Sequence, residues 1–176
     1  EWARLEPSRG RFDPEAVAHY RDELTRLREA GVTPLVTLHH FNVPGWFADA
    51  GGWLAPDAVN TFLRFVEKVV TELGDLAAEW ITINEPNIYA TKAYLYGEWP
   101  PGERSFPRTM AVMQALVAAH LAAYVRIHQL QPHAMVAVAH HLRVFAPAQR
   151  RNPVHALGAV ASRYLFQGAV VDATTT

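Results

Sequence analysis

The sequence of 176 residues contains no cysteine and no strong excess of either charge. Without cysteine there is no disulfide framework, no thiolate metal site and no cysteine nucleophile. With 16 basic and 17 acidic side chains the formal net charge is −1, unlike the basic surface that phosphate contacts require. No uninterrupted apolar run approaches the roughly 18 residues of a membrane span. We therefore expect no nucleic-acid partner and no membrane partner.

Apolar residues make up 50 % of the chain and charged residues 19 %, a composition that is typical of a globular protein. The sequence begins with Glu1, and no basic segment followed by an apolar one comes after it. We expect a cytoplasmic protein. Because residue 1 is not Met, this expectation leaves room for a signal upstream of Glu1.

Strand and helix signals alternate along the chain. Short apolar runs rich in β-branched residues predict strands buried on both faces, at residues 32–38, 80–84 and 135–139. Capping residues and apolar periodicity predict helices from Asp13-Pro14 to Gly31, from Pro56 to Gly74, within residues 108–130 and over residues 152–166. The opening residues Trp2–Leu5 are interpreted as the tail of an earlier strand.

Alternating strands and helices predict an α/β fold with a parallel sheet. The strand starts near residues 32, 80 and 135 lie roughly 50 residues apart, whereas a minimal βαβ unit takes about 30. The surplus follows each strand, and long loops in that position are typical of a (β/α)8 TIM barrel, where they build the active site. A doubly wound sheet is the competing fold, but no glycine-rich phosphate loop follows a strand.

Polar clusters stand at the carboxyl end of each predicted strand, where parallel α/β enzymes gather their catalytic groups. The clusters are His39-His40-Phe41-Asn42, Asn84-Glu85-Pro86-Asn87 and His140-His141. A carboxylate directly after a buried run, as Glu85 is, needs hydrogen-bond partners or a proton, and partial burial is typical of a general acid. The structural alternative is that Asn84 caps a helix whose first turn contains Glu85 and Pro86.

The histidines allow further interpretations. Side chains alternate across a strand, so only one histidine of each adjacent pair is expected to face the barrel mouth. A metal site built from His40, His141 and Glu85 is a weaker alternative, because adjacent histidines chelate poorly from one strand, and we predict no metal. His120 lies in a helical run and is expected to be a hydrogen-bonded structural residue.

Aromatic residues gather near the same loops. Aromatic rings stack on the C–H faces of sugars, so this clustering favours a cleft for a small carbohydrate. Phe41 and Trp99 are the predicted stacking residues, whereas Trp46 and Trp53 are expected to pack in the core.

Three segments occur in an order that resembles family 1 glycoside hydrolases, the β-glucosidase family. They are Thr37-Leu38-His39-His40-Phe41-Asn42-Val43-Pro44, Gly51-Gly52-Trp53 and Trp80-Ile81-Thr82-Ile83-Asn84-Glu85-Pro86. Residues 1–7 and the loop with Gly97 and Pro101-Gly102 are similar to the family pattern too. On this resemblance, residues 1–176 are one incomplete (β/α)8 catalytic domain, from about the end of strand 2 through the fifth βα unit, with no linker or second domain.

The resemblance implies hydrolysis of O-linked β-glycosides with retention, by double displacement and without metal or organic cofactor. It implies that Glu85 is the general acid/base, that Asn84 binds the 2-hydroxyl of the reacting sugar, and that His40 holds a hydroxyl of the same sugar. Phe41-Asn42 departs from the Trp-Asp of many members, which changes the sugar contact expected at Phe41.

Retaining hydrolysis needs a second carboxylate about 5–5.5 Å from the first, and no Thr-Glu-Asn-Gly-like nucleophile motif occurs here. We therefore expect the isolated chain to be inactive and, with two open strand edges, to fold poorly alone. The alternative function is a non-catalytic carbohydrate-binding or partner-binding module. The oligomeric state is not predicted.

Overall fold

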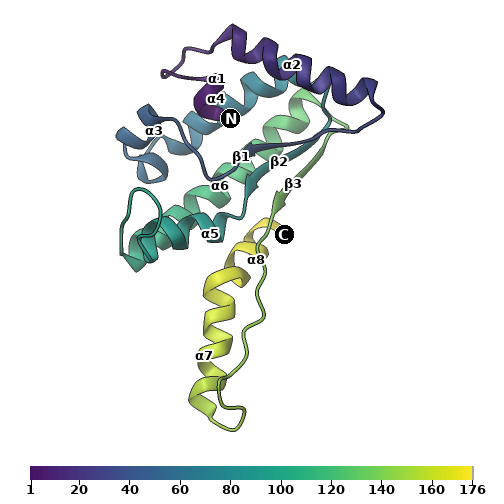
Figure 1. Ribbon diagram of the computed structural model, residues 1–176. Helices are drawn as coiled ribbons and strands as arrows, with labels where there is room; N and C mark the ends of the chain where they lie inside the picture. Colours follow the sequence, from purple (N-terminus) through teal and green to yellow (C-terminus); the bar gives the residue numbers. More distant parts are fainter. Residues whose placement is uncertain (176) are drawn as a thin grey trace.

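The computed structural model describes residues 1–175 and contains a three-stranded parallel sheet (Figure 1). Its strands are β1 (Leu35–His39), β2 (Glu79–Asn84) and β3 (Met135–Ala139), in the order β1-β2-β3. Each crossover adds the next neighbouring strand, which is the progression of a (β/α)8 barrel. The helices are α1 (Trp2–Leu5), α2 (Pro14–Glu29), α3 (Gly45–Asp49), η1 (Gly52–Leu54), α4 (Ala58–Leu73), α5 (Pro86–Ala90), η2 (Thr91–Leu95), α6 (Phe106–Leu130), α7 (Pro153–Arg163), η3 (Tyr164–Gly168) and α8 (Ala169–Thr175).

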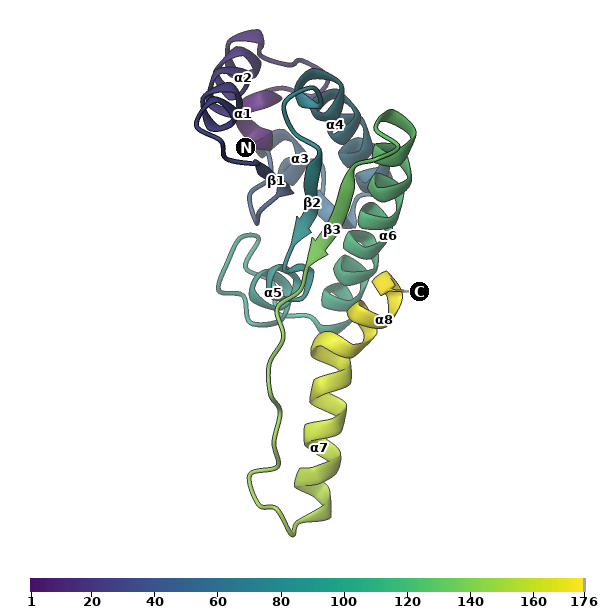
Figure 2. The ribbon, with the colours of Figure 1, turned by 90° about the vertical axis from the view of Figure 1, so that its right-hand side faces the viewer.

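Helices α4 and α6 pack against each other and cover one face of the sheet (Figure 2). Two β2 side chains reach α6 and its C-cap. Thr82 Oγ1 lies 2.7 Å from His120 Nδ1 in this helix, and Trp80 Nε1 donates to Oε1 of the C-cap residue Gln131 (2.8 Å). By length and composition alone α6 is apolar enough to cross a membrane. However, Leu116 and Ile127 are buried against α6's neighbours, as in the core helix of a folded domain.

From Asp13 onward the predicted order of helices and strands is confirmed. The predicted third strand has the bounds of β3, and the other predicted strands overlap β1 and β2. Helix α2 begins at Pro14, where the Asp13 carboxylate accepts a hydrogen bond from the Glu15 amide (2.9 Å). The capping residue and the proline after it therefore determine this boundary locally.

The interpretation of Trp2–Leu5 as a strand tail is wrong, because these residues form helix α1. The amides of Arg4 and Leu5 donate to the Glu1 carbonyl, and no sheet partner reaches the segment within residues 1–175. The Trp2 ring is buried and stacks on Phe65 of α4 at a centroid distance of 5.0 Å. The apolar positions at spacing three therefore anchor a helical turn rather than continue a sheet.

The expectation that the strands are buried on both faces is also wrong for the described part of the chain. The strand register places Leu35, Glu79 and Met135 side by side. On that face Leu35 is 55 % exposed and Met135 is 56 % exposed. The apolar runs predict strands that are suited to two-sided burial, but the amino-terminal ends of the strands are exposed on this face.

Residues 140–175 form an arm that extends from the sheet (Figures 1 and 2). An extended segment leads outward from β3, and α7 leads back towards α8, which contacts α6. The predicted helix over residues 152–166 is confirmed, and the Asn152 side chain accepts from the Val154 amide (3.0 Å) as its cap. None of the residues of α7 is buried.

Candidate active site

Glu85 lies directly after β2, at the carboxyl edge of the sheet, where the sequence predicts a functional carboxylate. Its backbone is left-handed (φ 44°, ψ 62°), a conformation that costs a non-glycine residue about 1–2 kcal/mol. The Glu85 amide donates to the Ala139 carbonyl at the end of β3 (2.8 Å), and the side chain is 30 % exposed. Strained positions of this kind cluster at functional sites.

The capping alternative for Asn84 does not describe the structure. Helix α5 begins at Pro86, so Glu85 rather than Asn84 occupies the N-cap position, and no side chain makes a capping hydrogen bond there. Asn84 is the last residue of β2 and is partly exposed. The Glu85 carboxylate thus makes no capping hydrogen bond and can interact with another partner.

That partner is His141, whose Nδ1 atom lies 3.2 Å from Glu85 Oε1. Arg143 Nε donates to His141 Nε2 (3.1 Å), and the Asn87 side-chain amide donates to the His141 carbonyl (2.8 Å). From the sequence, Glu85 and His141 come together only as candidate metal ligands, and their direct pairing is not predicted. The available signal was that both residues follow adjacent parallel strands.

The adjacent histidines at the carboxyl end of β1 occupy opposite environments, as strand alternation predicts. His40 is exposed, whereas His39 is 1 % exposed and is surrounded by the rings of Trp53, Phe62 and Tyr89. Burial, with a smaller effect of neighbouring His40, lowers the pKa of His39 to about 3. Neither ring nitrogen of His39 has a hydrogen-bond partner among the described residues. His39 is therefore neutral, and His40 is the one available to a ligand.

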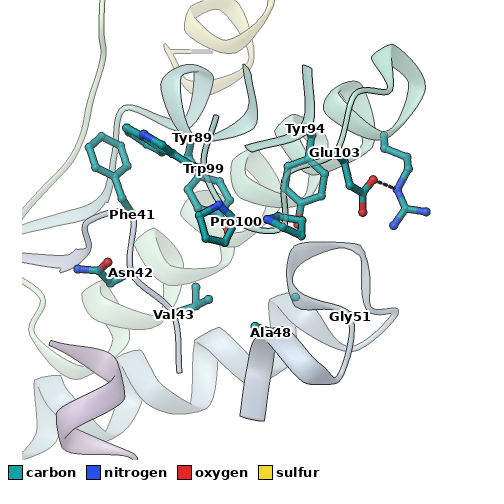
Figure 3. Close-up of a pocket in the computed structure, with 13 residues that line it drawn as sticks. Phe41, Asn42, Val43, Ala48, Gly51, Tyr89, Tyr94, Trp99, Pro100 and Glu103 are labelled. Carbon is teal, nitrogen blue, oxygen red and sulfur yellow. Dashed lines mark ion pairs between the residues drawn. The ribbon is translucent and has the colours of Figure 1, made fainter. Parts of the chain in front are cut away.

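A cavity of about 590 Å³ lies beside this edge of the sheet (Figure 3). Phe41 and Trp99, the predicted stacking residues, line it together, with ring centroids 4.9 Å apart. Its volume is in the range of small-molecule sites. The full lining is Phe41, Asn42, Val43, Ala48, Gly51, Gly52, Tyr89, Tyr94, Trp99, Pro100, Pro101, Glu103 and Arg108. Glu85, Asn84 and His40 are not among these residues, so the cavity does not enclose the candidate catalytic carboxylate.

Several other expectations concern packing. His120 is buried and its Nδ1 atom is within hydrogen-bond distance of Thr82 Oγ1, as predicted for a structural histidine. Burial lowers the pKa of His120. Trp53 is buried, and Trp46 packs against the core while its Nε1 donates to the Glu6 carbonyl (2.8 Å).

The metal alternative finds no support in the geometry. Across residues 1–175, no three His, Asp or Glu side chains are grouped so that they could hold a metal ion. His141 and Glu85 meet, but His40 does not complete a cluster with them.

The sequence model of the family described as "Glycosyl hydrolase family 1" matches residues 1–175. The chain is 32 % identical over 167 residues to a chloroplast galactolipid galactosyltransferase of Arabidopsis thaliana, covering 84 % of this chain and 26 % of that protein. It is 36 % identical over 103 residues to the cytosolic β-glucosidase of Homo sapiens, covering 57 % of this chain and 22 % of that protein. The chain therefore spans about a quarter of the length of these curated relatives.

The solved structures agree with these sequence matches. A β-glycosidase from Pyrococcus horikoshii is 32 % identical with a TM-score of 0.90, covering 98 % of this chain and 40 % of that one. A psychrophilic β-glucosidase from Micrococcus antarcticus is 28 % identical with a TM-score of 0.90, covering 94 % and 35 %. The sheet is part of a (β/α)8 barrel, and the chain belongs to glycosyl hydrolase family 1.

Proposed function

We propose that this chain supplies the acid/base half of the active site of a retaining β-glycosidase. The observation that carries the proposal is the Glu85 carboxylate, which stands at the carboxyl end of a barrel strand in a strained backbone conformation. Catalytic groups of (β/α)8 enzymes come from this edge. Glu85 would protonate the glycosidic oxygen as the bond to the sugar breaks, and would then remove a proton from the attacking water.

The second carboxylate of a retaining mechanism lies about 5–5.5 Å from the first and attacks the anomeric carbon. The sequence contains no Thr-Glu-Asn-Gly-like motif to supply it. In our proposal the nucleophile comes from outside this segment, and the 176-residue chain alone has no turnover. Asn84 would bind the 2-hydroxyl and His40 another hydroxyl of the reacting sugar.

Phe41 would contribute an apolar surface rather than a hydrogen bond, because a phenyl ring has no polar atom. Its contact with Trp99 continues this surface into the cavity of Figure 3. Stacking on the C–H face of a sugar needs such a surface, so we assign a small carbohydrate as the substrate class.

A chimera tests the acid/base role. Residues 1–175 replace the matched segment of the Pyrococcus horikoshii β-glycosidase, whose remaining chain completes the barrel. We expect the Glu85→Gln variant to lower kcat/KM for an alkyl β-glucoside by about 10²–10⁴-fold. Glu98→Gln, at an exposed acid in a loop, is the matched control. Undiminished turnover of Glu85→Gln in an active chimera would contradict the proposal.

Azide gives a second test of the same carboxylate. In a Glu85→Ala chimera, azide needs no general base to attack the glycosyl-enzyme intermediate, so it should restore turnover and release a β-glycosyl azide. An α-glycosyl azide would instead identify Glu85 as the nucleophile.

The acceptor in the second step is a separate question, because the relatives include both hydrolases and sugar transferases by name. Both reactions need the same acid/base group. We propose water as the acceptor. Release of free sugar in the presence of excess alcohol would support hydrolysis, and transfer products alone would indicate a transferase.

A further inference from the structure

We propose that His141, held in one tautomer by Arg143, is a positioning residue that determines which oxygen of Glu85 carries the catalytic proton. This inference rests on the acid/base role of Glu85 proposed above. It adds a residue from the segment that follows the neighbouring strand β3.

The hydrogen-bond roles follow from the chemistry of the two partners of His141. A guanidinium has five N–H donors and no acceptor, so Arg143 Nε can only donate to His141 Nε2 (3.1 Å). Nε2 is therefore unprotonated. The single proton of the neutral imidazole must be on Nδ1, which lies 3.2 Å from Glu85 Oε1. His141 thus donates to Glu85.

The donated hydrogen bond makes the two carboxylate oxygens of Glu85 different. Oε1 accepts from His141, so the acidic proton of the neutral carboxyl is placed on Oε2. When the bond between the anomeric carbon and the glycosidic oxygen breaks, its electron pair stays on that oxygen, which takes the proton from Oε2. In the second step Oε2 recovers a proton from water. His141 keeps its own proton throughout.

The segment that carries His141 is held at several points. The Asn87 side chain fixes the His141 carbonyl, and the Arg143 amide donates to Gln167 Oε1 (2.7 Å). The guanidinium carbon of Arg143 lies 4.7 Å from the centroid of the buried Phe166 ring. Gln167 and Phe166 belong to η3, which follows the outer helix α7. The return of the arm therefore holds Arg143 against the histidine.

Two substitutions at His141 distinguish the effect of its N–H donor from the effect of its side-chain volume. In His141→Asn the side-chain amide nitrogen takes nearly the place of Nδ1, so the donor is kept, whereas His141→Leu removes it. In the chimera, we expect His141→Leu to lower kcat/KM by about 10- to 100-fold for a β-glucoside with a poor, alkyl leaving group, the range for a hydrogen bond to a charged group.

A dinitrophenyl leaving group needs no protonation, so its kcat/KM, which reports only the step that forms the glycosyl-enzyme, should change little. For the alkyl glucoside, His141→Asn should recover most of the loss. Arg143→Met should reproduce part of the defect. His133→Leu, at an exposed turn residue, is the control. A loss in His141→Leu that is equal for all leaving groups would indicate a merely structural role and would overturn the inference.

The tautomer can be measured without any turnover. Nitrogen NMR of the chimera with 15N-labelled histidine should show His141 protonated on Nδ1, and Arg143→Met should introduce the Nε2 tautomer. A dominant Nε2–H form in the unmodified chimera would contradict the proposal.

The kinetic variants separate failure of this inference from failure of the proposed function. If Glu85→Gln leaves turnover intact, the proposed function fails. If Glu85→Gln abolishes turnover but His141→Leu does not alter the leaving-group dependence, only this inference fails.

Discussion

Helices α4 and α7 both carry apolar residues at helical spacing, yet one lies in the core and the other is surrounded by solvent. Helix α4 buries eight of its residues against the sheet, α1, α2 and α6. Helix α7 buries none, and Leu157 at its centre is 70 % exposed. Periodicity therefore indicates which face of a helix can be buried, but burial itself needs a neighbouring element to cover that face.

The same contrast separates the packed part of the molecule, residues 1–139, from the arm, residues 140–175. Ring contacts of Trp2, Phe62 and Phe65 link α1 to α4 in the packed part. The arm is joined to it through α8 and through the residues around His141. Regions with few buried apolar contacts open at lower free energy than the core, so the two parts should respond differently to substitution.

The largest difference is expected for truncation of an apolar side chain in each part. Phe62 is fully buried among aromatic rings, and Phe62→Ala should lower the free energy of unfolding by about 3–5 kcal/mol. Leu157→Ala, in the arm, should change it by less than about 0.5 kcal/mol. Urea unfolding of the two variants measures both. Equal losses would show that the arm and the packed part unfold as one unit.

A pH-dependent difference follows from His39, which is buried in the packed part. Its pKa is lowered to about 3, so between about pH 3 and 6.5 the unfolded chain binds a proton that the folded chain does not. Stability should fall as the pH drops through this window, by up to about 1.4 kcal/mol per pH unit from this group. In urea titrations His39→Phe should flatten this slope and the exposed His133→Phe should not; an unchanged slope in His39→Phe would contradict burial of a neutral histidine.

The smallest difference is expected at two matched helix caps. Asp13 and Asn152 each accept a hydrogen bond from the amide two residues later, at 2.9 Å and 3.0 Å. Asp13→Ala should lower global stability by about 1 kcal/mol. Asn152→Ala should speed amide hydrogen exchange in α7 and leave the urea midpoint unchanged. A shift of the midpoint in Asn152→Ala would mean that α7 is coupled to the core.

Local signals were sufficient for much of the fold. The Asp13-Pro14 cap marks the start of α2, and the apolar run of β3 has the predicted bounds, because both depend on neighbours in the sequence. The segment Trp2–Leu5 is an exception, since four residues are too few to establish a period that distinguishes a helical turn from a strand. The packing of Trp2 on Phe65, far along the chain, decides that it is helical.

The sequence by itself determined the order of strands and helices, the family through its ordered motifs, and the place of Glu85 at a strand end. Only the tertiary structure decided that Glu85 is left-handed, that His141, 56 residues later, lies 3.2 Å from its carboxylate, and that His39 is buried while His40 is exposed. The physical reason is that capping and periodicity act between near neighbours. Pairing across strands depends instead on register and on which faces other elements cover.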